Sequence, residues 1–113
     1  MPKKTLDPLP SAAFQILLAL TDGELHGYGI MRAVEQQTAG RVRLGPGTLY
    51  SSLQTLRDAG AIEELVNEAA NTERRRHYRL SGAGRRLVRS EAERLEELLR
   101  VARAKKVMEG HYA

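Results

Sequence analysis

The spacing of apolar residues predicts two helices in the first third of the chain. Residues 12–20 are apolar on nearly every side, which is typical of a buried helix. Ser11 suits its N-cap, and Asp22-Gly23 suits its end. A glycine-punctuated connection leads to a second helix over about 28–38, which Ala39-Gly40 stops. Its apolar face consists of Ile30, Ala33 and Val34.

A third helix is bracketed by Pro46, a favoured first-turn residue, and by Gly60, which can adopt the left-handed conformation that closes a helix. Before it, residues 41–44 alternate between basic and apolar side chains, as a short strand would. The apolar face of the third helix carries Leu49, Leu53 and Leu56. Its opposite face carries Ser51, Gln54 and Thr55, with Gly47 and Thr48 leading in.

After Gly60 the pattern becomes extended. Residues 61–66 and 74–80 predict the two strands of a hairpin with a polar tip, and Ser81 then suits the N-cap of a long helix that continues to about residue 106. The apolar positions of that helix recur every 3.5 residues on average, which makes a narrow seam that requires a second helix. The seam is formed by Val88, Ala92, Leu95, Leu99 and Ala102.

These elements predict a mainly α fold with a small β-hairpin, of the α+β class: a winged helix-turn-helix with a long C-terminal dimerisation helix. We expect three parts: a basic N-terminal arm over residues 1–10, the winged helix over 11–81, and the dimerisation helix with its tail over 82–113. The seam predicts a homodimer, because so small a domain cannot cover it.

Composition narrows the possible functions. The 113 residues suit one domain, and 18 Lys plus Arg against 14 Asp plus Glu give a net charge of +4, which favours a polyanionic partner. The absence of cysteine excludes disulfides, a thiol nucleophile and a cysteine-ligated zinc site. No apolar run approaches the roughly 18 residues of a membrane span, and no signal-peptide pattern opens the chain. We therefore expect a cytoplasmic protein without a membrane partner.

Enzymatic chemistry finds little support in the sequence. His26, His77 and His111 fall in a connection, a strand and the tail, with no spacing suited to a metal or to a nucleophile with its base. The glycines match no phosphate-binding motif. We expect no catalytic residue, no metal and no cofactor, and a structural role for His26.

The polar face of the third helix presents hydroxyls and an amide that can hydrogen-bond base edges or phosphates. A helix packed on a partner could use the same small residues. Tyr50 lies beside the apolar face, where its hydroxyl can reach a phosphate, or it is a half-buried core residue. The candidate DNA-binding residues are Gly47, Thr48, Tyr50, Ser51, Gln54, Thr55, Arg74, Arg75 and Arg76. The three arginines suit a wing on the phosphate backbone or in a narrow minor groove, or else a charged edge strand.

Three motifs in order resemble the PadR-type transcriptional regulators: residues 26–30 (HGYGI), 45–50 (GPGTLY) and 75–81 (RRHYRLS). The single long helix after them is similar to the short subclass. The resemblance implies a dimeric, sequence-specific DNA-binding regulator, most often a repressor, that binds an inverted-repeat operator in double-stranded DNA. It also supports a DNA contact by Tyr50. Family members often respond to a small-molecule effector, frequently aromatic or planar, near the dimer interface, and the lack of tryptophan here leaves that partner open.

Two other functions compete with this one. A winged helix can serve as a protein-interaction module without sequence-specific DNA binding, with the C-terminal seam joined to a different partner. Binding of RNA or of nucleic acid without sequence preference is the third alternative, and the scarcity of aromatic side chains for stacking argues against it.

Overall fold

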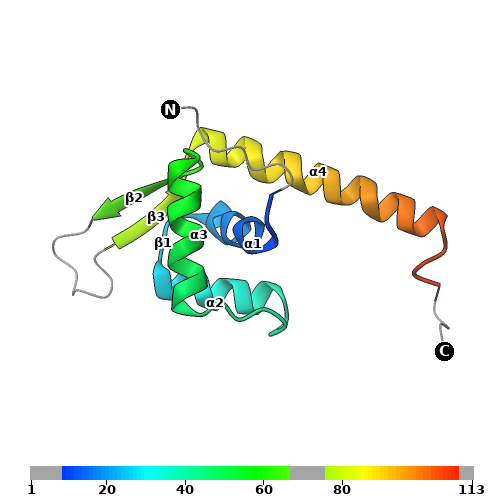
Figure 1. Ribbon diagram of the computed structural model, residues 1–113, viewed down its shortest axis with the longest axis horizontal. Coiled ribbons are helices and arrows are strands. Elements are labelled where there is room, and N and C mark those ends of the chain that lie inside the picture. The colour runs from blue at the N-terminus through cyan, green and yellow to red at the C-terminus, as the bar shows by residue number, and fades with distance from the viewer. Residues whose placement is uncertain (1–8, 67–75, 110–113) are drawn as a thin grey trace.

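The computed structural model describes residues 9–66 and 76–109 of the chain. Within these ranges the elements follow the order expected for a winged helix (Figure 1). They are α1 (Ser11–Ala19), the 3-10 helix η1 (Leu20–Asp22), β1 (Leu25–His26), α2 (Gly27–Gln37), α3 (Pro46–Asp58), β2 (Ile62–Val66), β3 (Arg76–Leu80) and α4 (Gly82–Ala104). The predicted α+β fold is confirmed.

Helix α1 forms the centre of the core, as its apolar sequence predicts. It packs against α2, α3 and the first half of α4, and Ile16 and Leu17 are fully buried. Burial of such a side chain stabilises a fold by about 1.5–3 kcal/mol. Leu9, which the sequence assigned to the basic arm, is also buried in this core. The core residues from the other helices are Ile30, Val34, Leu49, Leu53, Leu56 and Val88.

The sheet contains one strand more than the predicted hairpin. The three strands are antiparallel in the order β1-β3-β2, so β3 lies in the middle. Leu25 pairs with Tyr78 on one side of β3, and Ile62 pairs with Leu80 on the other. The two-residue β1 is too short to show an alternating pattern, and its partner β3 lies in the other half of the chain, so no local pattern predicts it.

Helix α3 begins and ends where its sequence predicts. Pro46 occupies the first turn, and Gly60 has a φ of 76° just after the helix. The amide of Ala61 donates to the carbonyl of Leu56 at 2.9 Å, and the amide of Gly60 donates to Arg57 at 2.9 Å. This pair of bonds is a Schellman motif, which satisfies two carbonyls at the end of the helix.

Two local predictions were wrong. Ser11 is the first residue of α1 and not its N-cap, because Pro10 takes the cap position and its carbonyl accepts a hydrogen bond from Phe14 at 3.0 Å. Residues 41–44 form no strand, since the hydroxyl of Thr38 at the end of α2 accepts a hydrogen bond from the amide of Val42 at 3.0 Å. The alternation there places Val42 and Leu44 against the core.

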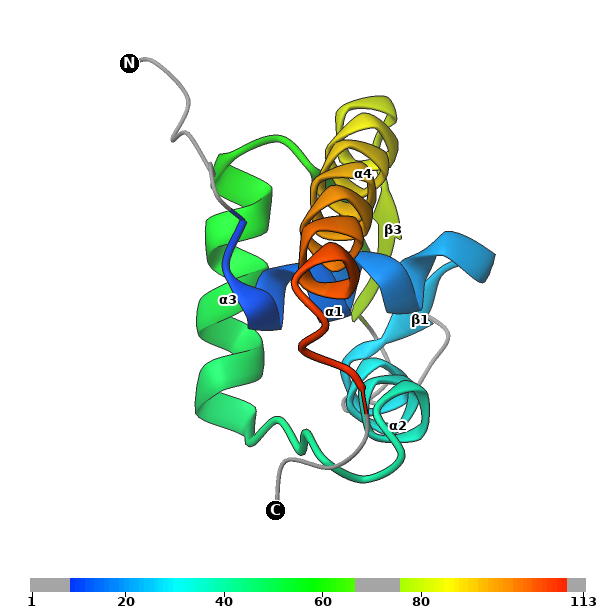
Figure 2. The ribbon, with the colours of Figure 1, turned by 90° about the vertical axis from the view of Figure 1, so that its right-hand side faces the viewer.

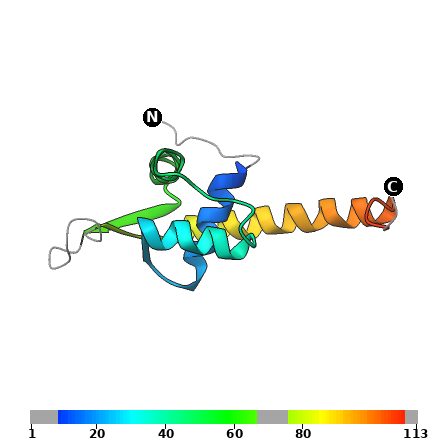
Figure 3. The same cartoon turned by 90° about the horizontal axis from the view of Figure 1, so that it is seen from below.

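Helix α4 is capped by Ser81, as predicted, whose hydroxyl accepts a hydrogen bond from the amide of Gly84 at 3.0 Å. Its first turn lies so close to the backbone of Ala61, just before β2, that Gly84 has no room for a side chain. Figure 2 shows α4 passing over α1, and Figure 3 shows its C-terminal half extending beyond every other element. No other element among the described residues therefore covers that half.

Candidate nucleic-acid interface

The polar face of α3 points away from the core, as the sequence predicts. Leu49, Leu53 and Leu56 are buried, with exposed fractions between 0% and 2%. On the opposite side, Thr55 is half-buried and its hydroxyl donates to the carbonyl of Ser51 at 3.1 Å. The remaining residues of this face are exposed, namely Gly47, Thr48, Tyr50, Ser51 and Gln54.

Gln54 is held in place by its neighbours on the helix. Its amide nitrogen donates to the Oδ1 of Asp58 at 2.9 Å, and its amide oxygen accepts a hydrogen bond from Arg57. A glutamine amide has two N–H groups and an oxygen with two lone pairs. One N–H donor and one oxygen lone pair of Gln54 thus remain free. Together they complement the N6 amino group and the N7 acceptor that adenine presents in the major groove.

Tyr50 lies between α3 and the start of α2. The residue is 51% exposed, and its hydroxyl oxygen lies 2.8 Å from the position that a Cβ atom on Gly27 would occupy. His26 fixes that end of α2 as its N-cap, because its Nδ1 accepts a hydrogen bond from the amide of Gly29 at 2.8 Å. The structural role predicted for His26 is confirmed, and Gly27 supplies the space for the Tyr50 hydroxyl.

The predicted wing is described only in part. Arg76 is the first residue of β3 and its side chain is exposed, whereas Arg74 and Arg75 lie outside the described residues. Further along β3, the Nε of Arg79 forms an ion pair with Oε1 of Glu63 on β2 at 3.1 Å.

A polar cluster behind α3 connects it to the sheet, and sequence reasoning missed it. The Nη1 of Arg57 lies 2.9 Å from Oε2 of Glu64 on β2, and the Glu64 carboxylate accepts a hydrogen bond from the hydroxyl of Tyr78 on β3. Burial of the phenol, then the negative charge of Glu64, raises the pKa of Tyr78 to about 12. Tyr78 therefore stays protonated up to strongly alkaline pH while the protein is folded, and the cluster links α3 to β2 and β3.

The face of α4 that carries the predicted seam is buried at its start and exposed further along the helix. Val88 is 9% exposed and belongs to the core of its own domain, so it is not available to a second subunit. Glu91 is also buried there, and hydrogen bonds from Arg94 lower its pKa. Further on, Leu95 and Leu99 are 38% and 40% exposed. The exposed part of this face consists of Ala92, Leu95, Leu98 and Leu99, with Ala102 half-buried.

No metal site is found in the part of the chain that the structure covers. Residues 9–66 and 76–109 contain no group of three or more His, Cys, Asp or Glu side chains that could hold a metal ion. The rings of His26 and His77 lie 6.0 Å apart, but the first caps α2 and the second faces Glu24 at 3.8 Å. None of the helices described is both long and apolar enough to cross a lipid bilayer.

Comparison with known proteins agrees with this architecture. The model of the transcriptional regulator PadR-like family matches residues 16–90, which run from the second half of α1 through α2, α3 and the sheet to the start of α4. The chain belongs to this family. A PadR-like regulator of transcription is consistent with the sequence-based expectation of a protein that is not an enzyme.

Individual relatives of this PadR-like chain differ in how much they share with it. An uncharacterized 37.1 kDa protein in transposon TN4556 of Streptomyces fradiae is 40% identical over 87 residues, which are 77% of this chain and 24% of that protein. The chain thus spans about a quarter of the length of that curated relative.

Two solved structures illustrate the shared fold. A transcriptional regulator from Clostridium thermocellum is 26% identical, with a TM-score of 0.71 over 81% of this chain and 89% of the other. PadR of Bacillus subtilis, whose structure is a complex with operator DNA, is 23% identical, with a TM-score of 0.64 over 74% of this chain and 47% of the other.

Proposed function

We propose that this PadR-like chain is a homodimeric, sequence-specific DNA-binding regulator that reads operator DNA with the polar face of α3. The observation that carries the proposal is that face itself, on which the hydroxyls of Thr48 and Ser51 and the amide of Gln54 are exposed. The one acidic residue of α3, Asp58, is the last residue of the helix. An α-helix of this kind fits the major groove. The Bacillus subtilis relative in complex with operator DNA supports the same function.

A dimer follows from α4. Three leucines, Leu95, Leu98 and Leu99, stand exposed on one helix face that extends beyond the domain (Figure 1). Burial of such a face against an identical helix removes it from water and relates the two α3 helices by a twofold axis. The operator should then be an inverted repeat whose half-sites lie about 34 Å apart, one turn of the duplex.

Repression is the direction of regulation that we propose, on the basis of family membership. A dimer that covers two half-sites next to a promoter blocks access to it. A small-molecule effector is part of the proposal only as a ligand of the α4 interface, where it would change the distance between the two α3 helices.

Selection of bound fragments from random duplex DNA tests the function directly. We expect recovery of one inverted-repeat sequence, bound with a higher affinity than a scrambled duplex of the same composition at one fixed salt concentration. Equal affinity for selected and scrambled duplexes would contradict sequence-specific binding.

The exposed leucines of α4 also favour a second candidate function, a winged helix that binds a different protein and reads no DNA sequence. In that case the chain would be a monomer by itself, and the selection would recover no sequence. The oligomeric state and the selection together distinguish the two candidates.

A further inference from the structure

A groove of about 300 Å³ lies beside the proposed DNA-reading face and plays no part in it so far. One wall is α2 and the other is the segment that leads into α3. Its lining combines cations, an aromatic ring and an apolar floor, and consists of Tyr28, Met31, Arg32, Glu35, Arg43 and Leu44.

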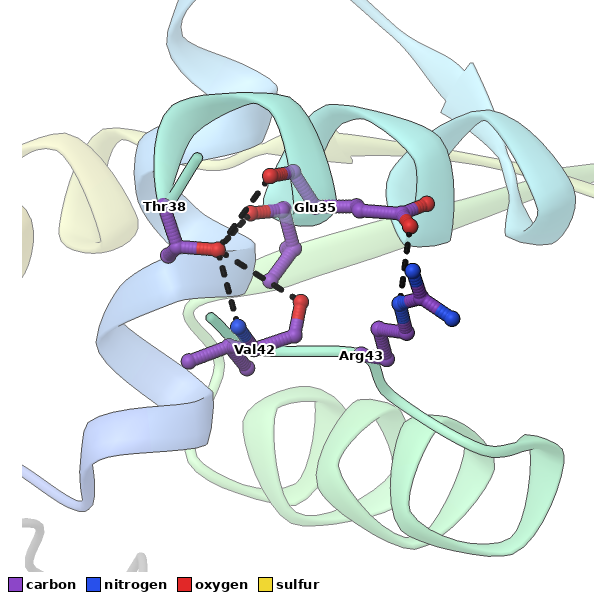
Figure 4. A network of polar contacts seen from close by, with 5 residues as sticks. Glu35, Thr38, Val42 and Arg43 are labelled. Carbon is purple, nitrogen blue, oxygen red and sulfur yellow. Dashed lines mark hydrogen bonds and ion pairs between the residues drawn. The ribbon is translucent and has the colours of Figure 1, made fainter. Parts of the chain in front are cut away.

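One of the two cations in the groove is already neutralised. The Nε of Arg43 lies 3.0 Å from Oε1 of Glu35 (Figure 4). The segment that carries Arg43 is fixed to α2 through Thr38, whose hydroxyl donates to the carbonyl of Val34 at 2.9 Å and accepts from the amide of Val42. This wall of the groove is therefore built in advance and adds little net charge.

Arg32 supplies the free positive charge. Its Nη1 lies 3.3 Å from the hydroxyl of Tyr28, one helical turn earlier, and its guanidinium carbon lies 5.9 Å from the centre of the tyrosine ring. None of the ion pairs found among the described residues includes Arg32. A guanidinium has five N–H donors, so most of those of Arg32 remain available to an anion from outside.

The start of α2, which carries Tyr28 of the groove, lies beside α3. A Cβ atom on Gly27 would lie 2.8 Å from the hydroxyl of Tyr50, and the next residue, Tyr28, is 56% exposed. Tyr50 and the groove residues Tyr28 and Arg32 thus stand on two helices that pack against each other. In helix-turn-helix domains the helix before the recognition helix crosses the DNA backbone.

We propose that Tyr28 and Arg32 form a binding site for one phosphodiester of the DNA strand beside the major groove read by α3, with the adjacent deoxyribose against Met31 and Leu44. This inference rests on the proposed DNA-binding function and assigns that function a contact outside α3 and the wing. A contact of this kind carries no base information, so it strengthens binding to every sequence alike.

The test compares Arg32→Ala with Arg100→Ala, which removes one arginine from α4, where Arg100 pairs with Glu97 at 2.7 Å. Each variant is titrated with selected and scrambled duplexes across a range of salt concentrations. We expect Arg32→Ala to weaken binding to both duplexes by a similar factor, roughly tenfold, and to make the slope of log K against log salt shallower by about 0.9. Arg100→Ala should leave the slope unchanged.

A second measurement locates the contact on the DNA. Duplexes that carry a single uncharged methylphosphonate linkage, moved along the site, should lose affinity for the wild type at the linkage that Arg32 binds. The Arg32→Ala variant should be indifferent to that substitution and still sensitive at the linkages bound by other residues. Tyr28→Phe should reduce the sensitivity at the same linkage.

Two results would overturn the inference in distinguishable ways. If the wild type binds the selected duplex but Arg32→Ala matches Arg100→Ala in slope and in methylphosphonate profile, the groove holds no phosphate and the DNA-binding function stands. If the wild type binds neither duplex, the proposed function fails and the groove contact fails with it. Arg32 and Arg100 are both exposed, so both variants should fold. Circular dichroism checks that they do.

Discussion

Arg57 on α3 and Glu64 on β2 form an ion pair, with Nη1 and Oε2 2.9 Å apart, that joins the proposed recognition helix to the wing. The two side chains are only 33% and 22% exposed, and the Nε of Arg57 is buried without a hydrogen-bond partner among the described residues. Glu64 faces Tyr78 across the β2-β3 ladder. One carboxylate therefore links α3 to both β2 and β3.

Neighbouring glutamates on β2 provide a matched test of this dependence. Glu64→Gln leaves Arg57 partly buried without its counter-charge, and should lower the free energy of unfolding by an amount between the ~1 kcal/mol of exposed pairs and the roughly 3–5 kcal/mol of buried ones. Glu63→Gln, whose pair with Arg79 is half exposed, should change it by less than about 1 kcal/mol. Urea denaturation measures both free energies. Equal effects would show that the Arg57–Glu64 pair contributes no more to stability than the exposed Arg79–Glu63 pair.

Stability at alkaline pH should depend on Tyr78. Its pKa is about 12 in the folded protein, against about 10 in an unfolded chain. Between these values the unfolded state releases the proton first, so stability is complete below pH 10 and falls by about 1.4 kcal/mol for each pH unit as pH rises toward 12. Tyr78→Phe should remove this loss. Difference absorbance of the phenolate between wild type and variant gives the midpoint, and a midpoint near 10 would refute the burial argument.

The helices could be predicted from sequence because their determinants are local. Pro46, Gly60 and Ser81 act within one turn of their own position, and the buried leucines of α3 repeat at helical spacing. The strand β1 could not, because two residues carry no period and β1 is stabilised by β3 from the other half of the chain. Residues 41–44 alternate like a strand, but the structure offers them no strand partner and Thr38 binds them instead.

The residues of the candidate site were likewise predictable from sequence only where their determinants are local. The exposed face of α3 follows from the helical period, so Gln54 and Tyr50 were found from sequence. Arg57 and Glu64 look like ordinary surface charges in the sequence, and their pairing needs the fold that brings β2 behind α3. The close approach of Gly27 to Tyr50 is equally long-range and depends on the fold that brings α2 beside α3.

The start of α4 predicts opposite effects for two nearby glycines. A Cβ atom on Gly84 would lie 2.0 Å from the carbonyl oxygen of Ala61, a backbone atom that cannot move aside cheaply. Gly84→Ala should therefore lower the free energy of unfolding by about 1–3 kcal/mol or more. A Cβ atom on Gly82 would meet only the Nη1 of Arg86 at 3.6 Å. Gly82→Ala should be neutral or stabilising by up to ~1 kcal/mol, because alanine favours the helix. Thermal denaturation of both variants checks the contrast.

The oligomeric state should depend on one side of α4. Leu95→Glu places a charge in the middle of the exposed leucine face and should convert a homodimer to a monomer at micromolar concentration, as measured by light scattering. Arg100→Glu introduces the same residue on the other side of the helix, beside Glu97, and should leave the dimer intact. A wild type that is monomeric under these conditions would argue against the dimer altogether.

Sequence readout should be separable from general DNA affinity within α3. Gln54 retains one free donor and one free acceptor, so Gln54→Ala should cost roughly 1–3 kcal/mol on the selected operator and little on a scrambled duplex. Thr55→Ala should act in the same direction.

Tyr50→Phe should differ from both, because a hydroxyl bound to a phosphate carries no base information and its loss weakens binding to the two duplexes alike. Gly27→Ala should reproduce the Tyr50→Phe result without touching α3, since a methyl group 2.8 Å from the Tyr50 hydroxyl forces the phenol to rotate. Paired titrations of operator and scrambled duplex at one salt concentration measure these ratios, with circular dichroism as the folding control. If Gln54→Ala and Thr55→Ala both leave the ratio of the two affinities unchanged, this face does not read the DNA sequence, and the protein-interaction function becomes the better account of the fold.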